Sequence, residues 1–170
     1  MKSFTAALAV IALLLPFSDA HGQRVTHTFS FNAAAIGGSN GSVFLAGGGT
    51  YDSQSGFAHG GGAFRCTADI NQGPFAGLRA GDGARWEIAQ ILPSSGFKCS
   101  GSAAEPLKTA VTDDDTVVLQ ARFYRQGDGN VVSFTAKVFV SGSDEDPDQF
   151  GTQNIWIQGV GCGEATVSVR

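Results

Sequence analysis

The segment from Gly41 to Cys66 mirrors itself around a short polar turn, and the rest of the chain is organised around it. Residues 53–56 are rich in Ser and Gly, as is typical of the loop of a β-hairpin. Folding the chain there predicts one register: Asp52 opposite Phe57, Tyr51 opposite Ala58, Thr50 opposite His59 and Leu45 opposite Phe64.

The same register places Gly47–Gly49 opposite Gly60–Gly62. Glycine weakens a strand, because it loses the most backbone entropy on folding and offers no side chain to pack. The glycines could allow the sharp bend that a barrel needs, close packing of a backbone or a large aromatic side chain, or a ligand platform. We favour the bend or the close packing, because glycine inside a strand usually marks a bulge or a close approach.

Alternation of apolar and polar residues with a period of two recurs along the chain, and no segment shows a capped helical period. The single core expected for residues 21–170 therefore comes from strands, and we predict one all-β domain built as an up-and-down antiparallel β-barrel of about 8–9 strands. A β-sandwich is the alternative. Besides the hairpin, the pattern predicts a turn at 93–96 and strands at 25–31, 85–92, 97–100, 116–125, 132–140, 153–159 and 164–169.

Residues 1–20 have the pattern of a signal peptide. Lys2 precedes an apolar run that is too short to span a membrane, and small residues follow at 18–20. The chain has 11 basic and 15 acidic residues, a net charge of −4, and no basic cluster. We therefore expect a secreted or periplasmic protein that binds neither nucleic acid nor membrane, and the composition leaves its oligomeric state open.

Three cysteines follow the predicted signal peptide. A secreted setting favours one disulfide and one cysteine left over, although sequence alone does not determine the pair. In a simple meander Cys66 ends one strand while Cys99 follows a later turn, which separates the two along the strands. We therefore favour Cys99–Cys162.

One strand carries the strongest binding pattern. If Ile155 and Ile157 face the core, then Asn154, Trp156 and Gln158 share the other face, where an indole can stack on a sugar ring while amides bond its hydroxyls. Gln120 and Tyr124 form a similar polar and aromatic face on another strand. The alternative is a tryptophan half-covered by its neighbours, and with the strand reversed the same residues would line a barrel cavity.

Other patterns are weaker. The G-x-S-x-G match at 37–41 and the HGGG at 59–62 lack the strand–turn–helix context of a hydrolase. Residues 144–148 alternate carboxylates as a calcium loop does, but they lack its glycine and its bidentate glutamate, and a solvated acidic loop is the simpler interpretation. His21 with His27 or His59 could chelate copper, although a frayed tail is the simpler interpretation. Asn40 begins a glycosylation sequon.

The chain resembles a group of small uncharacterised secreted bacterial proteins, with no known activity. The resemblance covers most of the predicted mature chain and rests on GGGTYD (47–52), GGAFRC (61–66), QGP (72–74), RW (85–86), FKC (97–99), LKTAV (107–111) and IWIQGVGCG (155–163). It implies a further cysteine where this chain has Leu78, which makes Cys66 the candidate unpaired cysteine.

We predict a non-catalytic protein, without metal or cofactor, that binds a glycan or a small apolar molecule at Trp156 or in a barrel mouth. One alternative is an enzyme, either a barrel-type isomerase or cyclase or a copper-dependent oxidase. It requires ionisable groups such as His27 and Glu87 to converge on a cavity. The other alternative is a structural or surface-interaction protein with a filled core and no pocket.

Overall fold

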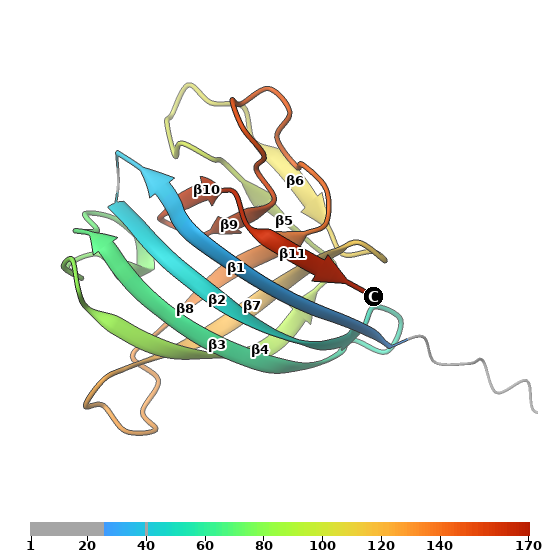
Figure 1. The fold of residues 1–170 in the computed structure, drawn as a ribbon, viewed down its shortest axis with the longest axis horizontal. Coiled ribbons are helices and arrows are strands. Elements are labelled where there is room, and N and C mark those ends of the chain that lie inside the picture. Colours follow the sequence, from blue (N-terminus) through green and yellow to red (C-terminus); the bar gives the residue numbers. More distant parts are fainter. Residues whose placement is uncertain (1–25, 40) are drawn as a thin grey trace, which may run out of the picture.

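The computed structural model describes residues 26–39 and 41–170. The predicted signal peptide, His21 and Asn40 lie outside these residues. Nine antiparallel strands form one curled sheet, a half-barrel, and two further strands form a small second sheet (Figure 1). The elements are β1 (His27–Gly38), β2 (Gly41–Asp52), β3 (Phe57–Ala68), the 3-10 helix η1 (Gly73–Phe75), β4 (Gly83–Leu92), β5 (Ser94–Phe97), β6 (Lys108–Val111), β7 (Thr116–Arg125), β8 (Phe134–Ser141), β9 (Ile155–Ile157), β10 (Gly161–Gly163) and β11 (Thr166–Val169).

The strand order in the large sheet is β10-β9-β8-β7-β4-β3-β2-β1-β11. Strands that follow one another in the chain are therefore neighbours, except where β5 and β6 leave the sheet and where β11 returns to pair with β1. The predicted up-and-down antiparallel barrel is confirmed, in the form of this half-barrel.

The central hairpin has the predicted register, from Asp52 opposite Phe57 out to Leu45 opposite Phe64. The six glycines face one another in this ladder, and the indole of Trp86 of β4 lies against two of them, Gly47 and Gly62. Its indole nitrogen donates a hydrogen bond of 3.1 Å to the carbonyl oxygen of Ala46. A Cβ at Gly62 would lie 2.8 Å from that nitrogen, so these two glycines provide room for a large aromatic side chain.

One apolar cluster fills the inside of the half-barrel. In β7 and β8 alternate residues reach this cluster, as the period-two alternation of the sequence predicts. From these two strands it contains Val117, Leu119, Ala121, Phe123, Ala136, Val138 and Val140, with Phe134 packed against it. Ile155 and Ile157 of β9 join the same cluster, as predicted.

The segment around β4 and β5 differs from the prediction. The ladder between β4 and β7 shifts between Ile88 and Gln90, so the residues after this bulge change faces. Ile91 packs against the inner cluster and Leu92 against the outer one, although strict alternation along the predicted strand at 85–92 would place Leu92 on the same face as Trp86. Residues 93–96 are not the predicted turn and 98–100 are not a strand, because Ser94–Phe97 forms β5 and pairs with β6, a strand that the sequence pattern did not predict.

The second sheet covers part of the outer face of the half-barrel. A second cluster of buried side chains lies between them and consists of Phe97, Cys99, Ala110, Val118, Phe139, Trp156 and Cys162. The Cys99–Cys162 disulfide joins the end of β5 to β10, as predicted, and Cys66 is free and buried. Trp156 thus lies in a second, smaller core and not on an open sheet surface.

Candidate functional site

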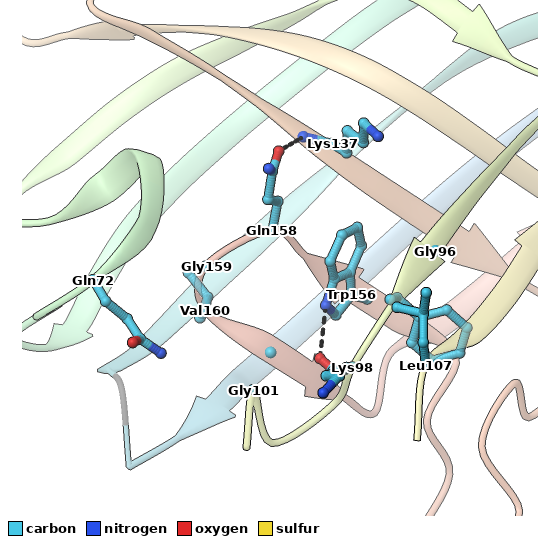
Figure 2. A pocket seen from close by; sticks show the side chains of 12 residues that line it. Gln72, Gly96, Lys98, Gly101, Leu107, Lys137, Trp156, Gln158, Gly159 and Val160 are labelled. Atoms are coloured by element: carbon cyan, nitrogen blue, oxygen red, sulfur yellow. Dashed lines mark hydrogen bonds between the residues drawn. The ribbon is translucent and has the colours of Figure 1, made fainter. Parts of the chain in front are cut away.

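A hollow of about 240 Å³ lies where the end of β9 meets β5 and the loop after it (Figure 2). We call it the outer hollow, because it is next to the outer cluster and not inside the half-barrel. Its lining is largely apolar or glycine, with four longer polar side chains. The lining residues are Gln72, Gly96, Phe97, Lys98, Gly101, Leu107, Lys137, Trp156, Gln158, Gly159, Val160 and Gly161.

Trp156 forms one wall of the outer hollow and is only 6% exposed. Its ring stacks on Phe139 at a centroid distance of 6.1 Å and lies 6.1 Å from that of Phe97. The indole nitrogen donates a hydrogen bond of 3.1 Å to the carbonyl oxygen of Lys98. The tryptophan is therefore held in one orientation and presents part of its ring to the hollow.

Gln158 lies beside Trp156 in the lining, as the sequence pattern predicted. Its backbone nitrogen donates to the Lys137 carbonyl at 2.9 Å, and its side-chain oxygen accepts from the Lys137 backbone nitrogen at 3.1 Å. The side chain thus extends the ladder between β8 and β9 (Figure 2). Its amide nitrogen makes no hydrogen bond to the described residues and remains available to a ligand.

Asn154 does not line the outer hollow. It is buried, its amide nitrogen donates to the carbonyl oxygen of Ala165 at 3.0 Å, and its side-chain oxygen accepts from the Ala165 nitrogen at 2.7 Å. Ala165 lies between β10 and β11, so this amide connects the start of β9 to the segment that runs along β1. The predicted trio is therefore split, because Asn154 has a structural role.

Gln120 and Tyr124 also lie outside the outer hollow. Gln120 is opposite Lys137 in the ladder between β7 and β8, one strand beyond the lining. Tyr124 is buried beneath Arg85, whose guanidinium lies 3.9 Å from the ring centroid, and its hydroxyl donates to Glu87 at 3.1 Å. The structure thus brings together Trp156 and Gln158, but not the two residues of β7.

Comparison of the chain with protein-family models, curated proteins and solved structures found no match. The resemblance to small secreted bacterial proteins stays a prediction, and the site is judged on its chemistry alone.

Of the lining residues, sequence analysis named only Trp156 and Gln158 as binding residues; Lys98, Leu107 and Lys137 are among those it missed. Lys98 and Leu107 belong to the β5–β6 segment, which was expected to contain a turn and a loop. Lys137 belongs to the outward face of β8, opposite the apolar positions from which that strand was recognised. The available signal was the predicted Cys99–Cys162 bridge, because it brings Lys98 close to the strand that follows Trp156.

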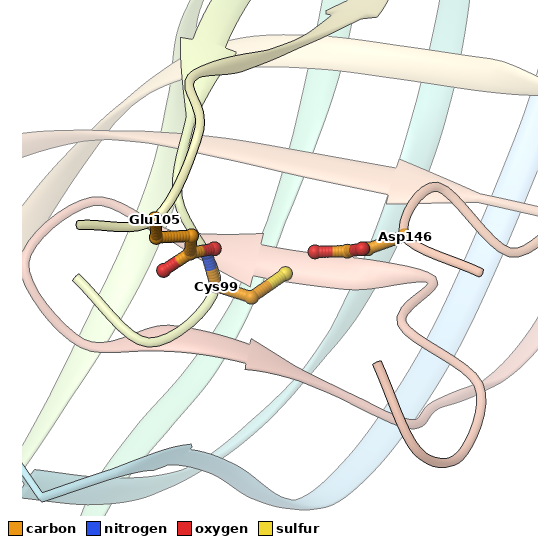
Figure 3. Close-up of side chains that lie close together, drawn as sticks. All are labelled: Cys99, Glu105 and Asp146. Carbon is orange, nitrogen blue, oxygen red and sulfur yellow. The ribbon is translucent and has the colours of Figure 1, made fainter. Parts of the chain in front are cut away.

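A group of potential metal ligands lies near the disulfide and consists of Cys99, Glu105 and Asp146, whose ligand atoms are within 4.8 Å of one another (Figure 3). The donor set fits a metal poorly, because the Cys99 sulfur is in the disulfide and offers no thiolate. Asp146 is fully buried and pairs with Lys108, which already balances its charge.

Glu105 has a structural role in the same loop. Burial raises its pKa, but hydrogen bonds from the Ser100 side chain and from the backbone of Cys99, Ser100 and Gly101 outweigh it and hold the pKa below the usual range. The carboxylate therefore orders the turn that carries Lys98 to the edge of the outer hollow.

The carboxylates of the acidic loop at 144–148 are held by contacts within the protein. Asp144 accepts hydrogen bonds from the backbone nitrogens of Asp146 and Gln153, both at 3.0 Å. Asp148 pairs with Lys108 at 2.8 Å, and the two carboxylates on Lys108 raise the pKa of its ammonium group. These contacts hold the loop, although one buried oxygen of Asp146, Oδ2, has no hydrogen-bond partner among the described residues.

The histidines considered for copper have separate surroundings. His27 stacks on Tyr51 at a centroid distance of 5.1 Å and lies 3.4 Å from a carboxylate oxygen of Asp114. His59 lies opposite Thr50 in the β2–β3 ladder, within the strand that holds the HGGG segment. Glu87, the other ionisable group considered for an enzyme, contacts Arg85 and Tyr124.

In the part of the chain that the structure describes, no helix is long and apolar enough to cross a membrane.

Proposed function

We propose that this chain is a secreted, non-catalytic binding protein that holds a sugar ring, or a ligand of similar size, in the outer hollow against Trp156. The observation that carries the proposal is the combination of a fixed indole with side-chain donors at its margin. A sugar ring has one face of C–H groups that packs on an aromatic ring, and hydroxyls at its edge that need hydrogen-bonding partners.

The placement of the site outside the half-barrel follows from packing. The inner cluster fills the interior with aromatic and aliphatic side chains, so a ligand in the barrel mouth is less favoured than one in the outer hollow. Among the lining residues only Lys98 and Lys137 are ionisable. The lining therefore lacks a carboxylate or imidazole for general acid–base catalysis, which favours binding over an isomerase or cyclase.

The size of the outer hollow sets the ligand class and the affinity. A volume of about 240 Å³ is below the roughly 300–1,000 Å³ usual for sites of drug-sized ligands, so it suits a single ring. At about −0.3 kcal/mol per non-hydrogen atom, a hexose of about 12 such atoms would bind with about −4 kcal/mol, a Kd of about 1 mM.

The experiment uses the two tryptophans of the chain. Trp86→Phe leaves Trp156 as the sole tryptophan, so its fluorescence and its indole N–H resonance report on the outer hollow alone. We expect methyl β-glucopyranoside and N-acetylglucosamine at millimolar concentrations to shift these signals. In wild-type protein the Trp86 signals should stay unchanged, because Trp86 is in the inner cluster.

The matched variant is Trp156→Phe, which keeps an aromatic ring in the outer cluster and should weaken sugar binding at least severalfold. Its affinity and that of the wild-type protein are compared by isothermal titration calorimetry, because the variant lacks the Trp156 signal. Trp156→Ala is a poor test, because removing a buried tryptophan costs about 3–5 kcal/mol of stability. If neither sugar shifts the Trp156 signals up to about 50 mM, well above the Kd expected from ligand size, or if Trp156→Phe binds unchanged, the proposal is wrong.

A further inference from the structure

The charged residues of the outer hollow are all of one sign. The chain has a net charge of −4, yet the lining contains Lys98 and Lys137 and no aspartate or glutamate. Both lysines are half-buried residues.

Neither ammonium group is paired with a carboxylate among the described residues. The Lys98 ammonium donates to the carbonyl oxygens of Ser102 and Ala103 at 3.0 and 3.2 Å, which are neutral acceptors. An ammonium has three donors, so one of them remains. The side chain of Lys137 makes no hydrogen bond or ion pair to the described residues.

Two other cations of the outer face have acidic partners. Lys108 is held by Asp146 and Asp148, and Arg85 pairs with Glu87 while it covers Tyr124. Arg122, on the exposed outward face of β7, makes no ion pair to the described residues, but it does not line the outer hollow. The two lysines are therefore distinguished by their position beside Trp156.

The two lysines flank the tryptophan. In Figure 2, Lys137 and Gln158 lie to one side of the Trp156 indole and Lys98 lies to the other. A ring stacked on this indole would have a lysine residue toward each edge, and the Gln158 amide nitrogen would add a donor next to Lys137. This arrangement offers donors and positive charge to the ligand, whereas its acceptors are limited to backbone carbonyls and the glutamine oxygens.

We infer that the ligand is an anionic sugar, with a carboxylate that binds to Lys137, whose ammonium group makes no hydrogen bond or ion pair to the described residues, while the ring packs on Trp156. A hexuronic acid is the simplest member of this class. The inference rests on the proposed function and adds the charge of the ligand to it. A carboxylate supplies the acidic partner that these ammonium groups lack, and charge-assisted hydrogen bonds are about twice as strong as neutral ones.

The test compares two probes that differ only at C6, methyl β-glucopyranosiduronate and methyl β-glucopyranoside. Both are titrated into the Trp86→Phe protein at low ionic strength, with Trp156 fluorescence as the signal. We expect the uronate to bind about tenfold more tightly, as one added charge-assisted hydrogen bond would give. The preference should shrink in 0.5 M NaCl, because salt screens half-exposed charges.

Two variants in the same background assign the effect to the hollow. Lys137→Gln should lose most of the preference for the uronate over the glucoside. Arg122→Gln is the matched control. It removes one positive charge from β7, the strand that pairs with β8, without changing the lining of the hollow. It should leave the preference intact.

The outcomes separate the two proposals. Equal binding of both probes would overturn the inference and leave the proposed function standing. If the preference for the uronate falls equally in both variants, the inference is also overturned. The preference would then come from positive charges across the surface and not from the hollow. If neither probe changes the Trp156 signal, both the inference and the proposed function are wrong.

Discussion

Gly62→Ala tests the packing of Trp86 on the glycines of the hairpin. A Cβ at Gly62 would lie 2.6 Å from the Cα of Gly47 and 2.8 Å from the Trp86 indole nitrogen, and closer still to the carbonyl oxygen of Ala46. Both the ladder and the indole would have to move, and the 3.1 Å hydrogen bond from Trp86 to Ala46 would be lost.

The expected loss of stability is the sum of three effects. Overpacking a filled site costs about 1–3 kcal/mol, and here the upper end applies because the contacts are to backbone atoms. The lost hydrogen bond costs about 1 kcal/mol, and the lower entropy of the unfolded alanine chain returns about 0.4–1 kcal/mol. The net loss is about 3 kcal/mol, which corresponds to a fall in Tm of about 6–12 °C for a domain of this size.

The assay is urea unfolding followed by tryptophan fluorescence, with free energies from linear extrapolation. Gly38→Ala is the matched control, because a Cβ there meets nothing within 4 Å, and we expect a change of less than about 1 kcal/mol. If Gly62→Ala and Gly38→Ala unfold at the same urea concentration, the glycines do not serve to accommodate Trp86, and the bend would become the better explanation.

Three further predictions concern the cysteines and Tyr51. Reduction of Cys99–Cys162, which spans 63 residues, should lower the free energy of unfolding by about 4 kcal/mol, seen as a lower urea midpoint in dithiothreitol; an unchanged midpoint would contradict the assignment. Burial raises the pKa of the Cys66 thiol to about 11, so iodoacetamide at pH 8 should leave it unmodified until urea unfolds the chain, whereas rapid alkylation would show that it is accessible. Burial and then the carboxylates of 113–115 raise the pKa of Tyr51 to about 12, while the unfolded value is about 10. The unfolded state therefore loses this proton first, and stability should fall by about 2–3 kcal/mol as pH rises from about 10 to 12, a loss that Tyr51→Phe should not show.

The features that followed from local pattern were predictable from the sequence. The mirrored order of residues around the turn determined the hairpin register, and alternation determined which faces of β7 and β8 are buried. The preference for Cys99–Cys162 was also confirmed, although it rested on a simple meander in which β5 and β6 were not foreseen.

The features that depend on distant partners were not predictable. The bulge after Ile88 reverses the faces of the last residues of β4, and nothing in a pattern of period two marks it. The sequence pattern favoured Asn154 as a ligand-binding amide. Its actual partner is the backbone of Ala165, between β10 and β11, which comes close only in the folded chain. The lysines of the outer hollow come together only when β5 and β8 are placed on either side of Trp156.

The pairing of β11 with β1 has a consequence for the order in which the molecule folds. Thr28 and Arg170 exchange backbone hydrogen bonds of 2.7 and 2.9 Å, although they lie at opposite ends of the described chain. The hairpins between neighbouring strands can form from short loops, whereas this ladder must wait until nearly the whole chain is present and both ends have met. Such a high contact order predicts folding in milliseconds to seconds, with the edge of β1 open to other chains until β11 arrives.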